Sequence, residues 1–303
     1  MNALWLPLSL VAGMLQIIRN AAQRGLSEKA GPWGATLVRF LFGLPFALIF
    51  FGMAWWFSPP VHPQFTTTLM IILPIGAAAQ VCATAALLAS MRASSFGLGS
   101  TFQHMSLPLA ALFGAVFLGD SLSVLAWFGI GVATFGLLAA SWPSGGLKAE
   151  LRAGRGVFKA GLFGLLSGAC FAISANAYRA CGLAIEPSAP FFSSALTLVL
   201  AQAMQSLVLS AVLFLADRNA LSAIFGDVKT SLLAGFTGAA ASACWFAALT
   251  LAPAALVRAV NALVEAPTAT VVGWLRFKEK IDLRQSFGAA LIVAGVLMSV
   301  LAK

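Results

Sequence analysis

Charged residues are scarce in this sequence of 303 residues. Asp, Glu, Lys and Arg together make up 9% of it, and 60% of the residues are hydrophobic. The mean hydropathy is +0.95. Soluble domains average about 25% charged residues, so this chain lacks the polar groups to cover a water-facing surface. We therefore predict an integral membrane protein with the lipid bilayer as its surroundings.

Acidic residues are scarcer still, because 9 Asp and Glu stand against 18 Lys and Arg, for a net charge of +9. No basic stripe with interleaved aromatic residues accompanies this excess, and no polar domain could carry one. We therefore expect no nucleic acid partner. In a membrane protein, an excess of Lys and Arg instead sets the orientation of the spans.

Metal-binding and catalytic patterns are also lacking. The four Cys show no metal-ligand spacing, and the two His, His62 and His104, lie far apart. No GxxxxGK[ST] phosphate loop occurs. We predict no metal, no cofactor and no enzymatic activity. Ser100 and His104 lie at helical spacing, which leaves an intramembrane serine protease as an alternative, and a channel is another.

Long apolar runs are what the sequence does contain. A membrane helix needs about 20 mostly apolar residues, and ten such runs can be counted, which predicts an all-α, multi-pass protein. The runs cover residues 3–22, 33–57, 66–90, 96–118, 122–142, 157–178, 190–216, 231–251, 254–277 and 284–301.

The ten runs divide five and five at the longest polar break. Shifting the chain by 159 residues aligns the halves without a gap and places Pro108 on Pro267, Gly114 on Gly273, Asp120 on Glu279 and Gly136 on Gly295. We predict a first repeat over 1–142, a connecting loop over 143–156 and a second repeat over 157–303. Because five spans are an odd number, the second repeat must be inverted in the membrane.

The segments "FLGDSLSVLAWFGIGVATFGLL" and "RFKEKIDLRQSFGAALIVAGVL" resemble the closing part of each EamA-type repeat. The sequence is thus similar to ten-helix members of the drug/metabolite transporter superfamily. One departure is Lys278, where the family usually has Gly. The resemblance implies efflux of a small metabolite, such as an amino acid or an amphipathic drug-like solute, across the inner (plasma) membrane by alternating access. A flippase for a lipid or lipid-linked carrier is the alternative with the same fold.

Two signals disagree about orientation. Loops after odd-numbered spans hold most of the basic residues, among them Arg92, Lys148 and Lys229. The positive-inside rule then predicts both termini outside. The resemblance implies both termini inside. Ten spans enclose a cavity by themselves, so a monomer suffices, and a homodimer is the alternative.

Charged groups inside apolar spans mark candidate functional residues. Arg258, Asn261 and Glu265 are spaced three and four apart in the ninth run and share one helix face. The helix-breaking Pro267 follows. In the fourth run, Gln103 and His104 precede the matching Pro108. We predict that Glu265 and His104 lie at similar depths beside a wet cavity.

Two chemistries suit this group, and a purely structural role is the alternative. Glu265 or His104 could carry a coupled proton. Arg258 and Glu265 could instead hold the opposite charges of a zwitterion, or only join two helices as an ion pair. Further candidates for the cavity are Asn20, Asn176 and Arg39, with Trp245 as part of its wall. We expect Arg19, Arg24 and Arg179 to extend towards lipid headgroups.

Overall fold

Hydrocarbon offers no hydrogen-bond partner to the backbone, so apolar runs of this length fold as α-helices. The computed structural model describes residues 4–93, 103–141, 156–278 and 283–301, and these contain helices and no strand. In chain order the helices are α1 (Trp5–Leu41), α2 (Leu44–Phe57), α3 (Thr67–Ala93), the short 3-10 helix η1 (Gln103–Met105), α5 (Ser106–Leu118), α6 (Val124–Ser141), α8 (Gly156–Ile185), α9 (Pro190–Ala216), α10 (Arg218–Gly226), α11 (Val228–Leu251), α12 (Ala254–Phe277) and α13 (Leu283–Leu301).

The length and composition of these helices fit a membrane protein. Within the described residues, five helical segments are long and apolar enough to cross a bilayer, and one of them, Trp5–Phe57, has 53 residues. At about 1.5 Å per residue it is long enough for two crossings of a hydrocarbon core about 30 Å thick. Shorter apolar helices cover Gln103–Leu118, Val124–Gly136 and Ser286–Leu301. The described residues thus form an all-α membrane protein, and each of the ten predicted apolar runs lies largely on helix where it is described.

The first two spans join differently from the prediction. The run 3–22 was predicted to end in a polar break, but α1 continues to Gly31, where φ is +67° and the helix bends before Pro32. The second span therefore consists of the end of α1 and α2, with a turn at Phe42 and Gly43. The break prediction was wrong because "QRGLSEKA" is amphipathic: Gln23 is buried and donates to the Ala35 carbonyl across the bend at 2.7 Å, while Lys29 is exposed.

A short helix that the sequence did not suggest lies between the seventh and eighth spans. The segment was interpreted as a loop, but α10 occupies it, and an aspartate caps the N-terminus of both α10 and the helix after it. Asp217 accepts from the Ala220 N–H at 2.9 Å, and Asp227 accepts from the Thr230 N–H at 3.2 Å. An aspartate at this position satisfies a backbone donor that the helix itself leaves unpaired.

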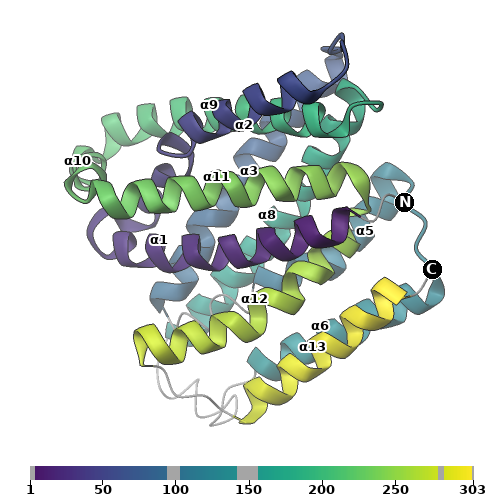
Figure 1. Cartoon of the computed structure of the whole chain (residues 1–303). Helices are drawn as coiled ribbons and strands as arrows, with labels where there is room; N and C mark the ends of the chain where they lie inside the picture. The colour runs from purple at the N-terminus through teal and green to yellow at the C-terminus, as the bar shows by residue number, and fades with distance from the viewer. Residues whose placement is uncertain (1–3, 94–102, 142–155, 279–282, 302–303) are drawn as a thin grey trace.

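The helices pair as a twofold relation between the repeats requires. α8 is the equivalent of α1, and α11 is the equivalent of α3. α1 packs along α11, and α8 packs along α3. In the same way α1 contacts α12 while α8 contacts α5. Figure 1 shows α1 and α11 side by side, with α1 beginning and α13 ending at one end of the bundle, as an even number of crossings requires.

The last helices of the two repeats, α6 and α13, show the inversion most directly. A Cβ on Gly129 would lie 2.5 Å from the Gly295 carbonyl oxygen, and one on Gly136 would lie 2.7 Å from that of Gly288. The offset of 159 equates Gly129 with Gly288 and Gly136 with Gly295. The two contacts are therefore the same contact seen from each repeat, and the two helices cross in opposite directions. The fold is two inverted five-helix repeats.

The turn that closes each repeat also has a matched backbone. Gly119 follows α5 with φ +66°, and Lys278, its equivalent at the offset of 159, follows α12 with φ +55°. A left-handed residue after a helix is a common way to end it, and glycine adopts this conformation without a steric penalty. The unusual Lys278 therefore keeps the conformation of the glycine it replaces. Glu279 and most of the predicted connecting loop, residues 142–155, lie outside the described residues.

Candidate functional site

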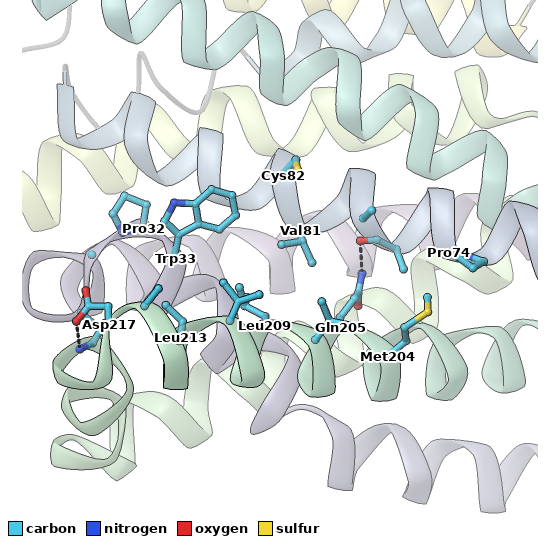
Figure 2. A pocket seen from close by; sticks show the side chains of 18 residues that line it. Pro32, Trp33, Pro74, Val81, Cys82, Met204, Gln205, Leu209, Leu213 and Asp217 are labelled. Carbon is cyan, nitrogen blue, oxygen red and sulfur yellow. Dashed lines mark hydrogen bonds between the residues drawn. The ribbon is translucent and has the colours of Figure 1, made fainter.

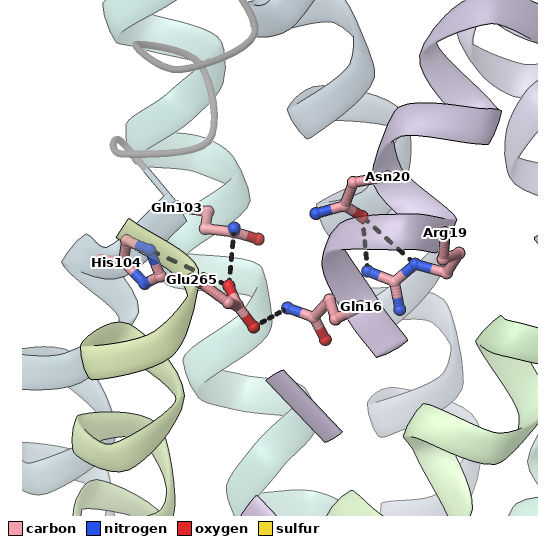
Figure 3. A network of polar contacts seen from close by, with 6 residues as sticks. All are labelled: Gln16, Arg19, Asn20, Gln103, His104 and Glu265. Carbon is pink, nitrogen blue, oxygen red and sulfur yellow. Dashed lines mark hydrogen bonds and ion pairs between the residues drawn. The ribbon is translucent and has the colours of Figure 1, made fainter. Parts of the chain in front are cut away.

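Glu265 lies at the meeting point of three helices. Its carboxylate accepts from the Gln16 Nε2 of α1 at 2.5 Å and from the Gln103 Nε2 of η1 at 3.0 Å. His104 Nε2 is 3.8 Å from the same carboxylate. Glu265 and Gln103 are 0% exposed. Figure 3 shows these side chains converging on Glu265 from α1 and η1. The carboxylate of one repeat thus accepts hydrogen bonds from side chains of the other.

Asn261 lies one turn before Glu265 and ties α12 to two other helices. With its amide oriented to satisfy both neighbours, it donates to the Ser9 carbonyl of α1 at 2.7 Å and accepts from the indole N–H of Trp245 at 2.6 Å. Trp245 belongs to α11 and is 3% exposed. Its indole therefore forms part of the interior wall around α12.

Arg258 completes the face of α12 and is held by aromatic rings. Its guanidinium carbon lies 4.6 Å from the ring centroid of Trp245 and 4.9 Å from that of Phe171. Nε and Nη2 have no hydrogen-bond partner among the described residues, although the side chain is buried. Arg258 and Glu265 interact electrostatically without forming a direct ion pair.

A second group of polar residues lies between α1, α3 and α11. Arg39 donates to Thr84 Oγ1 of α3 and to Ser242 Oγ of α11, both at 3.1 Å. Arg19 donates through Nε and Nη2 to Asn20 Oδ1, the latter at 2.7 Å. The prediction that Arg19 reaches lipid headgroups was wrong, since it is 0% exposed. Its neighbours Gln16, Asn20 and Gln23 are buried with it on one helix face, which explains why it turns inward.

A third group, at the interface of α3, α8 and α9, is uncharged. The Tyr178 hydroxyl donates to Gln80 Oε1 at 2.9 Å, and Gln205 Nε2 donates to the same oxygen at 2.8 Å. Tyr178 and Phe246 stack with ring centroids 4.3 Å apart. These hydrogen bonds join α3, α8 and α9.

The remaining candidates lie apart from Glu265. Asn176 donates to the carbonyls of Ala110 and Ala172, at 3.2 and 3.0 Å, and so fastens α8 to α5. Arg179 also faces the protein and not the headgroups. It forms an ion pair of 2.9 Å with Asp120 and donates to the Leu249 and Ala252 carbonyls at the end of α11. That prediction was wrong because Asp120 and these unpaired carbonyls attract the guanidinium.

The two prolines occupy different positions in their helices. Pro108 is the third residue of α5, directly after η1, where a backbone N–H has no helical partner to lose. α12 continues through Pro267. Pro267 was predicted to break its helix, but α12 does not end at this residue.

A pocket of about 720 Å³ lies elsewhere, between α3, α9 and the bend in α1. Its walls are mostly apolar, and Trp33 and Val208 on its rim are about half exposed. Figure 2 shows the side chains of α3 and α9 facing each other across it. Gln205 lines the pocket and also bonds to Gln80, so the third polar group lies directly behind it.

Gln16 and Arg19 were not among the predicted site residues. Their signal was present, because residues 16, 19, 20 and 23 follow helical spacing on one polar face of an otherwise apolar span. The partners Thr84, Ser242 and Ser9 gave no comparable signal, since isolated hydroxyls are common in membrane helices.

Comparisons with known proteins agree with this fold. The sequence profile of the EamA-like transporter family matches residues 4–142 and again residues 158–301. A solved structure titled only "Crystal structure of protein" superposes with a TM-score of 0.58 at 15% identity, covering 97% of this chain and 98% of that one. At this identity the likeness concerns the fold alone. No functionally curated protein matches the sequence.

Proposed function

The chain belongs to the EamA-like transporter family, and we propose that it is a secondary transporter in which Glu265 carries a coupled proton. Members of this family are membrane transporters of small solutes. The finer proposal is export of a small metabolite, such as an amino acid or an amphipathic drug-like solute, across the inner (plasma) membrane by alternating access.

One observation carries this proposal: Glu265 is held across the interface between the repeats. Its partners Gln16, Gln103 and His104 belong to the first repeat, and Glu265 belongs to the second. In alternating access one repeat moves against the other around a central site. Such movement separates the carboxylate from its partners, so its protonation changes with the state of the transporter. A buried carboxylate that alternates between two surroundings is suited to carrying a proton.

Proton movement on substrate binding tests the proposal. Purified protein in weakly buffered detergent is mixed with a panel of amino acids, nucleosides and cationic drugs, and a pH-sensitive dye records release or uptake. We expect a signal in the wild type that is lost in Glu265→Gln. The matched control is Glu186→Gln, which changes a carboxylate in the turn between α8 and α9. Ligand binding without proton movement in any variant would refute proton coupling.

A lipid or lipid-carrier flippase is the second candidate, and the pocket between α3 and α9 favours it. A flippase needs a lateral apolar opening, and this pocket has apolar walls and exposed rim residues. Replacing Ala78 on its wall with Trp fills the pocket. If the protein is a flippase, A78W stops the movement of a fluorescent phospholipid between leaflets of proteoliposomes. A solute transporter shows no such movement in the wild type.

A further inference from the structure

The interior of the protein carries more positive than negative charge. Arg19, Arg39 and Arg258 are 0%, 2% and 2% exposed, and a guanidinium stays protonated in proteins. Glu265 is the buried acidic residue among those that the structure describes. Three positive charges against one negative charge leave an excess of two. Arg179 does not add to this excess, because Asp120 pairs with it.

The three arginines lie along one face of α11. A Cβ on Gly238 would lie 3.1 Å from Arg39 Cγ and 3.2 Å from Arg19 Cδ, so both side chains pass this glycine. One turn later, Ser242 accepts from Arg39. Trp245 follows with Arg258 over its ring. Arg258 interacts electrostatically with Arg39 and Glu265, and Arg19 interacts with Arg39 and Arg258, so the three guanidinium groups lie near one another.

The arginines keep donors that the protein leaves unused. Arg19 Nη1, Arg39 Nε, and Arg258 Nε and Nη2 are buried and have no hydrogen-bond partner within the described part of the chain. Buried donors without partners and buried charges without counter-charges both destabilise a protein. The unpaired donors and the uncompensated positive charge of these arginines therefore point to a ligand that accepts hydrogen bonds and carries negative charge.

We infer that the transported solute is an anion whose carboxylate or phosphate head is bound by Arg19, Arg39 and Arg258. This inference rests on the transport function proposed above. A carboxylate or phosphate offers several acceptor oxygens and matches the guanidinium fork. A neutral solute leaves the excess charge uncompensated, and a cation adds to it. The rings of Trp245 and Phe171 around Arg258 suit an apolar portion next to the anionic head.

The inference fixes the direction of proton movement. Glu265 is the negative partner of this cluster in the absence of solute. An arriving anion repels the Glu265 carboxylate, while Arg19 and Arg258 are drawn to the solute. The neutral carboxyl is then favoured, so the protein takes up a proton when the anion binds. The groups facing Glu265 are Gln16 and Arg19 of α1, Gln103 and His104 of η1, and Arg258 of α12 itself. A cationic solute would displace a proton instead.

Four probes with one aromatic ring each test the inference: benzoate, phenyl phosphate, benzamide and benzylammonium. Isothermal titration calorimetry in two buffers of different ionisation heat gives the affinity and the number of protons exchanged. We expect an anion to bind with proton uptake, and benzamide and benzylammonium to bind at least about tenfold more weakly, as expected for lost charge-assisted hydrogen bonds. Equal or tighter binding of benzamide or benzylammonium would overturn the inference, and so would no binding of any probe.

Variants then locate the site. Each of Arg19→Gln, Arg39→Gln and Arg258→Gln is expected to weaken anion binding about tenfold to hundredfold. Arg258→Lys keeps the charge and should weaken anion binding less. Arg218→Gln, at an exposed position of α10, should leave anion binding unchanged. Unchanged binding in all three glutamine variants would contradict the assignment. If the glutamine variants do not fold, the comparison of the four probes on the wild type still decides the inference.

Two further arms separate related outcomes. The first arm uses nanodiscs of phosphatidylglycerol or phosphatidylcholine. If the natural ligand is an anionic lipid headgroup, phosphatidylglycerol competes with benzoate, and benzoate binds more weakly there than in phosphatidylcholine. If the natural ligand is a soluble anion, benzoate binds equally in both. In proteoliposomes, radiolabelled benzoate and benzylammonium are followed by counterflow. Anion binding without counterflow would refute transport and leave the anion site standing. Counterflow of benzylammonium alone would support transport and overturn the anion inference.

Discussion

The two repeats share a backbone but not a chemistry. Arg19 in α1 and Tyr178 in α8 are equivalent at the offset of 159. Both are buried, and α1 packs on α11 while α8 packs on α3. The first belongs to a group with excess positive charge, and the second to an uncharged network with Gln80 and Gln205. Likewise, Glu265 of α12 corresponds to Ser106 of α5. Symmetry thus supplies matched pairs of helices, and the departures from symmetry place the buried arginines beside α11 and an uncharged network beside α3.

The largest effect is expected where the two repeats differ most, at Glu265 and Ser106. Glu265→Gln keeps the shape of the side chain but cannot exchange a proton, so we expect proton-driven transport in proteoliposomes to fall at least about 100-fold, of the order expected for losing hydrogen bonds to a charged group. Ser106→Ala changes the equivalent buried position of the first repeat and should leave transport near the wild-type rate. Similar losses in both variants would mean that the site is symmetric after all.

Where the repeats are alike, paired substitutions should have paired effects. Gly136→Val and Gly295→Val, which change equivalent positions at the offset of 159, both force a side chain into the opposing helix of the α6–α13 contact. Each should destabilise the protein by about 1–3 kcal/mol through overpacking, seen as equal drops in melting temperature. Gly131→Val is the matched control, since no atom lies within 4 Å of a Cβ there. Unequal effects at Gly136 and Gly295 would contradict the twofold contact.

Arg19 and Tyr178 should separate function from stability. Tyr178→Phe removes the hydroxyl that bonds to Gln80 and Gln205, so we expect a loss of about 1–2 kcal/mol in stability and unchanged transport. Arg19→Gln should reduce transport about tenfold through the loss of charge-assisted hydrogen bonds, while stability is kept, because it relieves an uncompensated buried charge. Counterflow and thermal unfolding on the same preparations check both. A transport defect in Tyr178→Phe would assign the uncharged network to the transport site.

The smallest effect concerns the turns that close the repeats. Lys278 has the left-handed conformation that Gly119 adopts at the equivalent place. Lys278→Gly should therefore raise stability by about 0.5–1 kcal/mol, and Gly119→Ala should lower it by about 1 kcal/mol, because a Cβ is disfavoured there. Melting temperatures of both variants decide this. No change in either would show that the two turns tolerate a side chain equally.

Composition and periodicity alone were enough to predict most of the fold. Spans of about 20 apolar residues must be helical in a bilayer, and the constant offset of 159 between the halves required an inverted second repeat because five is odd. The same reasoning found the polar face of α12, since Arg258, Asn261 and Glu265 follow helical spacing. The site residues remain predictions for experiment, but their burial follows from that spacing together with the cost of exposing charge to lipid.

The tertiary structure decided which polar groups meet. The sequence could not show that α1 continues to Gly31, because helix ends outside the hydrocarbon are not marked by apolar residues. Nor could it show that Gln16 reaches Glu265, a contact between residues 249 positions apart. Arg19 and Arg179 looked alike as basic residues near span ends, yet Asp120 pairs with Arg179 while Arg19 keeps an unused donor. Local spacing sets which face a side chain occupies, whereas its partner depends on which helix packs against that face.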